Sequence, residues 1–141
     1  MIIRLNLATK PEDPLWPALE ELAATLKTDA DGAPSGLAQS LAKLHRALLV
    51  HVDQTEAPLG LLYEMSIEAP QLRGQVEELR HDHPILEKQL QELLEAFDSQ
   101  VSDWRTCRLK IMKVLSKLSQ HRKMGFDLIH DAYYLEIGGR G

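Results

Sequence analysis

Residues 13–51 read DPLWPALEELAATLKTDADGAPSGLAQSLAKLHRALLVH and contain two leucine patterns separated by a break. In the first pattern, apolar residues recur at intervals of four and three, as they do along one face of an α-helix. This pattern consists of Leu15, Leu19, Leu22 and Leu26. Asp13 is the expected N-cap of the helix, with Pro14 at the first helical position. The turn-forming residues 29–34 are expected to end it.

A second helix is predicted after this break, with Ser35 as its cap. Pro58 lies inside its pattern and should kink or interrupt it, and residues 66–70 form the next break. The face of this helix consists of Leu37, Leu41, Leu44, Leu48, positions 51 and 55, and Leu62.

Two more helices follow in the C-terminal half of the chain. Pro84 should kink the first of them near residues 80–84. Its face consists of Leu79, position 83, Leu86, Leu90, Leu93 and Phe97. The last helix is expected to be capped by Ser102 or Asp103 and stopped by Gly138 and Gly139. Its face consists of Ile111, Leu115, Leu118, positions 121 and 125, Leu128, Ala132 and Leu135.

Four amphipathic helices joined by short loops bury one another best as an antiparallel four-helix bundle, so the fold class is predicted to be all-α. With 141 residues, the chain has the size of one domain, residues 1–141, in which residues 1–12 form an extended N-terminal arm. The net charge of −5 argues against nucleic-acid binding, which needs clustered Lys and Arg. No apolar run is long enough to cross a membrane. Cys107 is the single cysteine, which fits a cytoplasmic location.

Histidines occupy positions on three of these apolar faces. His51 lies three residues after Leu48, His83 four after Leu79, and His121 three after Leu118. Each histidine therefore points toward the interior from a different helix. Helix bundles build metal sites from side chains on facing helices, and imidazole is a ligand for iron, zinc, copper and nickel. These three histidines are the predicted metal ligands, if they lie at one level along the bundle.

Three segments resemble the hemerythrin-like (HHE cation-binding) domains. Residues 44–58, LHRALLVHVDQTEAP, resemble the second helix of that family, in which glutamate follows histidine by four residues. Residues 79–86, LRHDHPIL, resemble its third-helix histidine motif, and residues 118–129, LSQHRKMGFDLI, resemble its fourth helix. The likeness covers residues 13–136. It implies a bundle that holds two oxo-bridged irons between histidines and bridging carboxylates, with a role in oxygen binding or in iron or redox sensing.

The chain departs from the family pattern at the bridging positions. Thr55 stands four residues after His51, Gly125 stands four after His121, and no histidine occurs between residues 15 and 26. Glu56 is a candidate substitute ligand, although at 100° per residue it lies about 140° around a regular helix from His51. Glu87, four residues after His83, could reach the same site from the edge of its helix face.

Two functions follow from this incomplete ligand set. In the first, a reduced site of His51, His83 and His121, with Glu56, binds iron and serves oxygen, redox or iron sensing. In the second, the bundle is metal-free and acts as a protein-interaction or regulatory module. Tyr133, Tyr134 and Ile137 either cover one end of the bundle, the favoured interpretation, or form a docking patch for a protein partner or a second copy, since aromatics are enriched at interfaces. Beyond the metal, nothing in the sequence indicates an enzyme.

Overall fold

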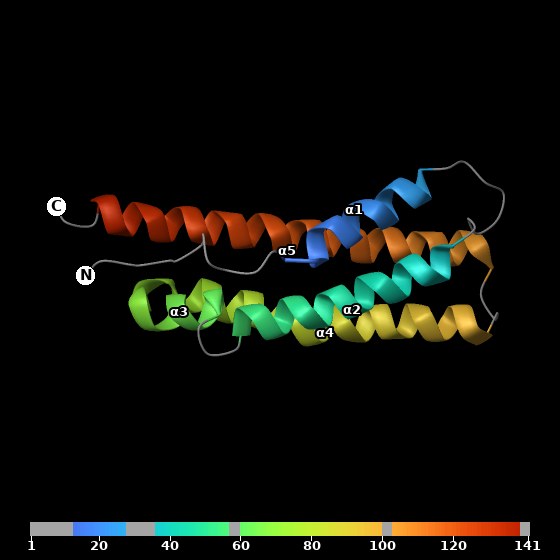
Figure 1. The fold of residues 1–141 in the computed structure, drawn as a ribbon, viewed down its shortest axis with the longest axis horizontal. Helices are drawn as coiled ribbons and strands as arrows, with labels where there is room; N and C mark the ends of the chain where they lie inside the picture. The colour runs from blue at the N-terminus through green and yellow to red at the C-terminus, as the bar shows by residue number, and fades with distance from the viewer. Residues whose placement is uncertain (1–12, 28–35, 57–59, 100–102, 139–141) are drawn as a thin grey trace.

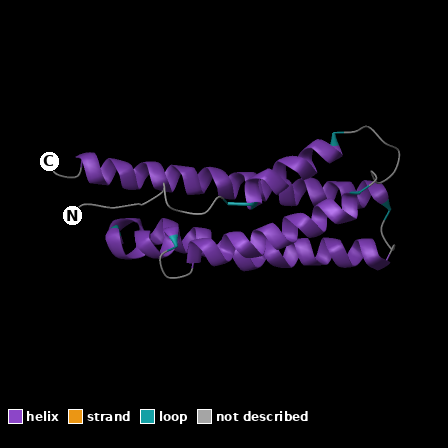
Figure 2. Cartoon of the chain, viewed as in Figure 1, coloured by secondary structure: helices purple, strands orange, loops and turns teal. Residues whose placement is uncertain are grey.

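The computed structural model describes residues 13–27, 36–56, 60–99 and 103–138, with side chains for all of these except 98–99 and 133–138. This part of the chain is all-α, and it contains helices but no strand (Figure 2). The helices are α1 (Leu15–Leu26), α2 (Leu37–Glu56), α3 (Leu61–Glu68), the 3₁₀-helix η2 (Pro70–Leu72), α4 (Arg73–Ser99) and α5 (Trp104–Gly138). No helix in these ranges has the length and apolar character needed to cross a membrane.

The predicted helical segments match this order closely. The second predicted helix is divided into α2 and α3, because α2 ends at Glu56, shortly before Pro58. The third was expected to kink near Pro84, and α4 runs without interruption through this proline. The expected arm at residues 1–12, the cap Ser35 and the residues Pro58, Ser102 and Gly139 lie outside the described residues.

Asp13 and Asp103, two of the predicted caps, each accept a backbone N–H at a helix start. Pro14, predicted at the first helical position, is the N-cap residue itself, and α1 begins one residue later at Leu15. The backbone N–H of Leu15 donates to Oδ1 of Asp13 at 3.0 Å. The backbone N–H of Thr106 donates to Oδ1 of Asp103 at 2.9 Å. Such caps satisfy N–H groups that have no partner within the helix.

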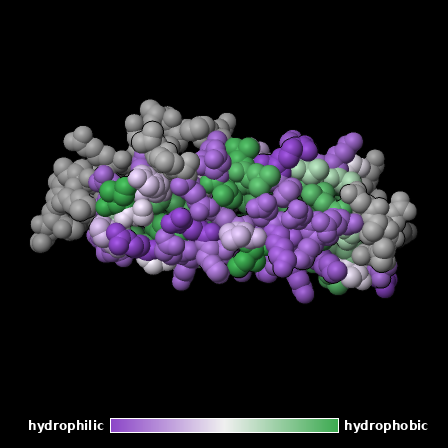
Figure 3. All heavy atoms as spheres, turned by 90° about the horizontal axis from the view of Figure 1, so that it is seen from below, coloured by the Kyte–Doolittle hydropathy of each residue, from purple (hydrophilic) through white to green (hydrophobic). Residues whose placement is uncertain are grey.

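The long helices pack side by side around a shared interior (Figure 1). Helix α1 contacts α2, α2 contacts α4, α4 contacts α5, and α5 contacts α1. Helix α3 lies against α2 and α4 and extends the structure at one end (Figure 1). The outer face seen in Figure 3 is mostly hydrophilic, with small separate hydrophobic patches.

Buried apolar residues form two clusters along this interior. The larger cluster joins α1, α2, α4 and α5 and includes Leu48, Leu86 and Leu118. The smaller one joins α3, η2, α4 and α5 and includes Leu79 and Leu128. The three histidines singled out in the sequence lie next to these leucines along the chain. His51 follows Leu48, His83 lies between Leu79 and Leu86, and His121 follows Leu118. They therefore occupy the layer where one apolar cluster gives way to the other.

Candidate metal centre

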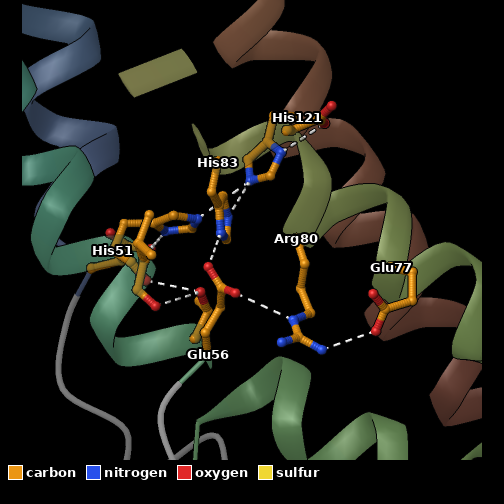
Figure 4. A network of polar contacts seen from close by, with 10 residues as sticks. His51, Glu56, Glu77, Arg80, His83 and His121 are labelled. Carbon is orange, nitrogen blue, oxygen red and sulfur yellow. Dashed lines mark hydrogen bonds and ion pairs between the residues drawn. The ribbon is translucent and has the colours of Figure 1, made fainter. Parts of the chain in front are cut away.

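The structure brings the three histidines together at one level of the interior. His51 on α2, His83 on α4 and His121 on α5 have exposed fractions of 6%, 1% and 4%. Nε2 of His121 lies 3.3 Å from Nε2 of His51 and 3.2 Å from Nε2 of His83. One ligand atom from each ring lies within 4.8 Å of the other two. The convergence that helical periodicity alone left open is therefore present (Figure 4).

Each ring also has a carboxylate at its other nitrogen. Nδ1 of His83 lies 2.7 Å from Oε2 of Glu56, and Nδ1 of His121 lies 3.1 Å from Oδ2 of Asp82. Nδ1 of His51 is in hydrogen-bond contact with Oδ2 of Asp13. An ionised carboxylate can only accept, so each Nδ1 carries the hydrogen and donates it. Nε2 of a neutral ring is then an acceptor, and its lone pair faces the interior.

The carboxylates lie closer to solvent than the rings that they hold. Side-chain exposure is 23% for Asp13, 26% for Glu56 and 38% for Asp82. An ionised carboxylate keeps part of its hydration there, while the imidazole fills apolar space. The arrangement fixes both the tautomer and the orientation of each ring.

Glu56, predicted as a ligand, lies on the Nδ1 side of His83. Its Oε2 accepts from His83, and its Oε1 accepts from Nε of Arg80 at 3.2 Å. Arg80 in turn donates from Nη1 to Oε1 of Glu77 at 2.9 Å (Figure 4). Within the described part of the chain, the cluster of converging ligand atoms consists of the three histidines, and neither Glu56 nor Glu87 belongs to it.

Sequence reasoning missed two residues of this site. Asp13 was identified as a helix cap, and its second oxygen holds His51. Asp82 directly precedes His83 in the sequence but was not predicted as a site residue, because its partner His121 lies on another helix. A carboxylate adjacent to a metal-ligand candidate is the signal that could have identified Asp82.

Thr55 and Gly125 occupy the two positions where the hemerythrin-like pattern has bridging carboxylates. Oγ1 of Thr55 donates to the backbone carbonyl of His51 at 2.9 Å, so this hydroxyl is turned toward its own helix. A Cβ placed on Gly125 would meet no atom within 4 Å. Thr55 and Gly125 both line a cavity of about 90 Å³ that borders His51 and His121.

Burial disfavours the charged forms of His83 and His121. The pKa of His83 is lowered to about 4, chiefly by desolvation and in smaller part by the nearby rings of His51 and His121, against the opposing effect of Glu56. Desolvation also lowers the pKa of His121, against the opposing hydrogen bond to Asp82. Burial alone would raise the pKa of Glu56, but its hydrogen bonds from His83 and Arg80 lower it overall. For His83 and Glu56, both shifts favour a neutral ring held by an ionised carboxylate.

Two of the three donor separations match the spacing of ligands around one metal ion, and one ligand atom from each ring lies within 4.8 Å of the other two. Two ligands about 2.0–2.1 Å from a tetrahedral zinc ion are separated by about 3.3–3.4 Å, from the bond length and angle alone. The two Nε2 separations of 3.3 and 3.2 Å agree with this spacing. A di-iron centre needs bridging carboxylates, and the carboxylates described here are engaged by the Nδ1 atoms instead.

The side chains of Tyr133, Tyr134 and Ile137, which were considered as a docking patch, lie outside the described part. No model of a protein family, no curated protein and no solved structure matches the chain at a significant level.

Proposed function

We propose that this protein binds one divalent transition-metal ion through the Nε2 atoms of His51, His83 and His121. The observation that carries the proposal is the meeting of three imidazole lone pairs in a buried space. Each ring gives its only hydrogen to a carboxylate, so the Nε2 atoms have no proton with which to bond one another. Three acceptor lone pairs at this spacing repel one another, and a shared cation would remove that repulsion.

A proton would be the simplest cation to share, but the surroundings oppose it. A charged imidazolium in this apolar layer would lose its hydration, and desolvation is the largest influence on the pKa of His83. A metal ion instead coordinates all three lone pairs at once. It is also matched by three carboxylates, which as outer partners orient the ligands and raise their basicity.

The donor set narrows the identity of the metal. Three neutral imidazoles suit iron(II), zinc, cobalt(II), nickel or copper(II), and they suit calcium or magnesium poorly because those ions prefer oxygen. Three protein ligands leave a fourth position of a tetrahedral ion free, which is typical of sites that bind a further molecule rather than purely structural ones. Such a metal supplies a Lewis-acidic position or, for iron, a redox-active one.

We further propose that the scaffold is an antiparallel four-helix bundle of the hemerythrin-like type with a reduced, single-metal site. The closed set of contacts among α1, α2, α4 and α5 supports the bundle. The histidines on α2, α4 and α5 support the resemblance. On this basis the protein is a sensor or carrier, whose metal reports oxygen, redox state or iron through its open position.

The metal content of untagged protein tests this proposal. We expect about one equivalent per chain after loading with iron(II), zinc or cobalt(II), and loss of this stoichiometric metal in His83→Ala. His81→Ala is the matched control, because His81 lies two residues away on the same helix with an exposed side chain. Two irons per chain with oxo-bridge absorption would contradict the single-metal site. Failure of every metal to bind would leave the alternative of a metal-free interaction module.

A further inference from the structure

We propose that the cavity beside the three histidines binds a small aliphatic carboxylate, with its oxygen on the free position of the metal and its alkyl chain in the cavity. This inference rests on the proposed metal site. It assigns to that site a class of ligand, which the three histidines alone do not specify.

The cavity lies where the ligand set is incomplete. It borders His51 on α2 and His121 on α5. Thr55 lies one helical turn after His51, and Gly125 lies one turn after His121. A glutamate at either of these positions would extend into the same space. Their small size leaves a chamber of about 90 Å³ next to the ligand rings.

The walls of the chamber match an alkyl chain. Most of the lining is apolar and comes from Leu61, Leu62, Leu79, Phe126 and Ile129. A dry cavity of about 150 Å³ lined by such residues accommodates benzene. The smaller volume here, about 90 Å³, fits a chain of a few carbon atoms.

The charges around the chamber favour an anionic head group. The polar lining residues are Asp13, whose carboxylate is engaged by His51, Thr55, whose hydroxyl is engaged by its own helix, and Arg122. The guanidinium of Arg122 is ion-paired through Nη1 with Oε1 of Glu20 at 3.3 Å, and it lies 5.3 Å from the ring centre of Trp16 and 5.4 Å from that of Phe126, two further lining residues. The preference for an anion therefore comes from the proposed divalent metal ion, which repels cations, and carboxylate oxygen is an ordinary zinc ligand.

Cobalt(II)-loaded protein provides the test, because the visible bands of cobalt respond to a new ligand. Acetate, propionate, butyrate and hexanoate are titrated in turn. Each methylene buried in the cavity should lower the half-saturating concentration about fourfold. This gain in affinity per methylene should hold from acetate to butyrate and stop before hexanoate, whose chain is too long for the cavity.

Gly125→Leu fills the chamber and should abolish the gain from acetate to butyrate while cobalt binding persists. Gly74→Leu is the matched control, since Gly74 also lies in a helix where an added Cβ meets nothing within 4 Å. This control should keep the full chain-length series. Cobalt bands that do not respond to carboxylates, or that respond equally to all four, would overturn the inference and leave the metal site standing. Absence of cobalt bands would overturn both.

Discussion

Nδ1 of His83 donates to Oε2 of Glu56 across 2.7 Å, which turns the other nitrogen of the ring toward His121. The same carboxylate accepts from Arg80 through Oε1. Glu56, the last residue of α2, therefore orients a ring on α4, whereas the sequence predicted it as a substitute metal ligand. Its function in the site is positioning.

Replacing Glu56 with Gln should weaken metal binding while the fold persists. The amide oxygen can still accept from Nδ1, but the negative charge that raises the basicity of His83 is lost. Loss of an outer partner of this kind typically costs 10–100-fold in metal affinity, and we expect a zinc competition titration to show a loss of about this size. Glu77→Gln removes the outer carboxylate on Arg80 and should leave the affinity unchanged. An equal loss in both variants would indicate a general charge effect.

Asp13 and Asp103 form a second matched pair. Both cap a helix through Oδ1, and Asp13 also holds His51. Replacing Asp103 with Ala should lower the free energy of unfolding by about 1 kcal/mol through loss of the cap, as measured by urea denaturation of metal-free protein. Asp13→Ala should lower it by more, because the buried Nδ1–H of His51 also loses its acceptor. Only Asp13→Ala should also weaken zinc binding. Zinc affinity that is equal in the two variants would remove Asp13 from the site.

The sequence predicted the helices and the three histidines because both depend on a period within one helix. Leu48 and His51, or Leu118 and His121, lie on one face whatever the neighbouring helices do. The carboxylate partners could not be predicted this way, because Asp82 lies on α4 and its ring lies on α5. Which side chain contacts Asp82 depends on how α4 and α5 are rotated about their axes relative to each other. Helical geometry places Glu56 away from the face of His51, and in the structure Glu56 accepts from His83 on another helix.

The metal-free protein should lose stability as the pH falls from about 6.5 toward about 4. The pKa of His83 is 6.5 in its ordinary state and about 4 in the folded protein, chiefly because burial disfavours its charged form. In this window the unfolded chain binds a proton that the folded chain does not, so the free energy of unfolding falls with pH. The pKa of His121 is lowered in the same direction. For His83 the full effect is on the order of 3 kcal/mol. Denaturation midpoints at several pH values, after treatment with a chelator, measure it.

Replacing His83 with Leu separates the metal from the core. In the metal-free state this variant should be at least as stable as the wild type, because it removes a buried polar ring from the apolar layer. It should also lose part of the acid sensitivity just described. Zinc at a thousand times its dissociation constant should stabilise the wild type by about 4 kcal/mol and the variant not at all. Thermal unfolding with and without zinc checks both points, and a variant that zinc still stabilises would contradict the three-histidine site.

Restoring carboxylates at the positions of Thr55 and Gly125 should convert the chamber into a second metal position. The double variant Thr55→Glu, Gly125→Glu places two acidic side chains next to His51 and His121, where the wild type has an apolar-lined space. Carboxylate oxygens near one another in partial burial repel until a cation is shared between them. We therefore expect cobalt stoichiometry to rise above one per chain, the second ion binding more weakly than the first. Thr55→Gln, Gly125→Gln fills the same volume without charge and should hold a single ion. If the acidic variant also holds only one metal ion, the cavity does not correspond to the position of the second metal in a hemerythrin-like centre.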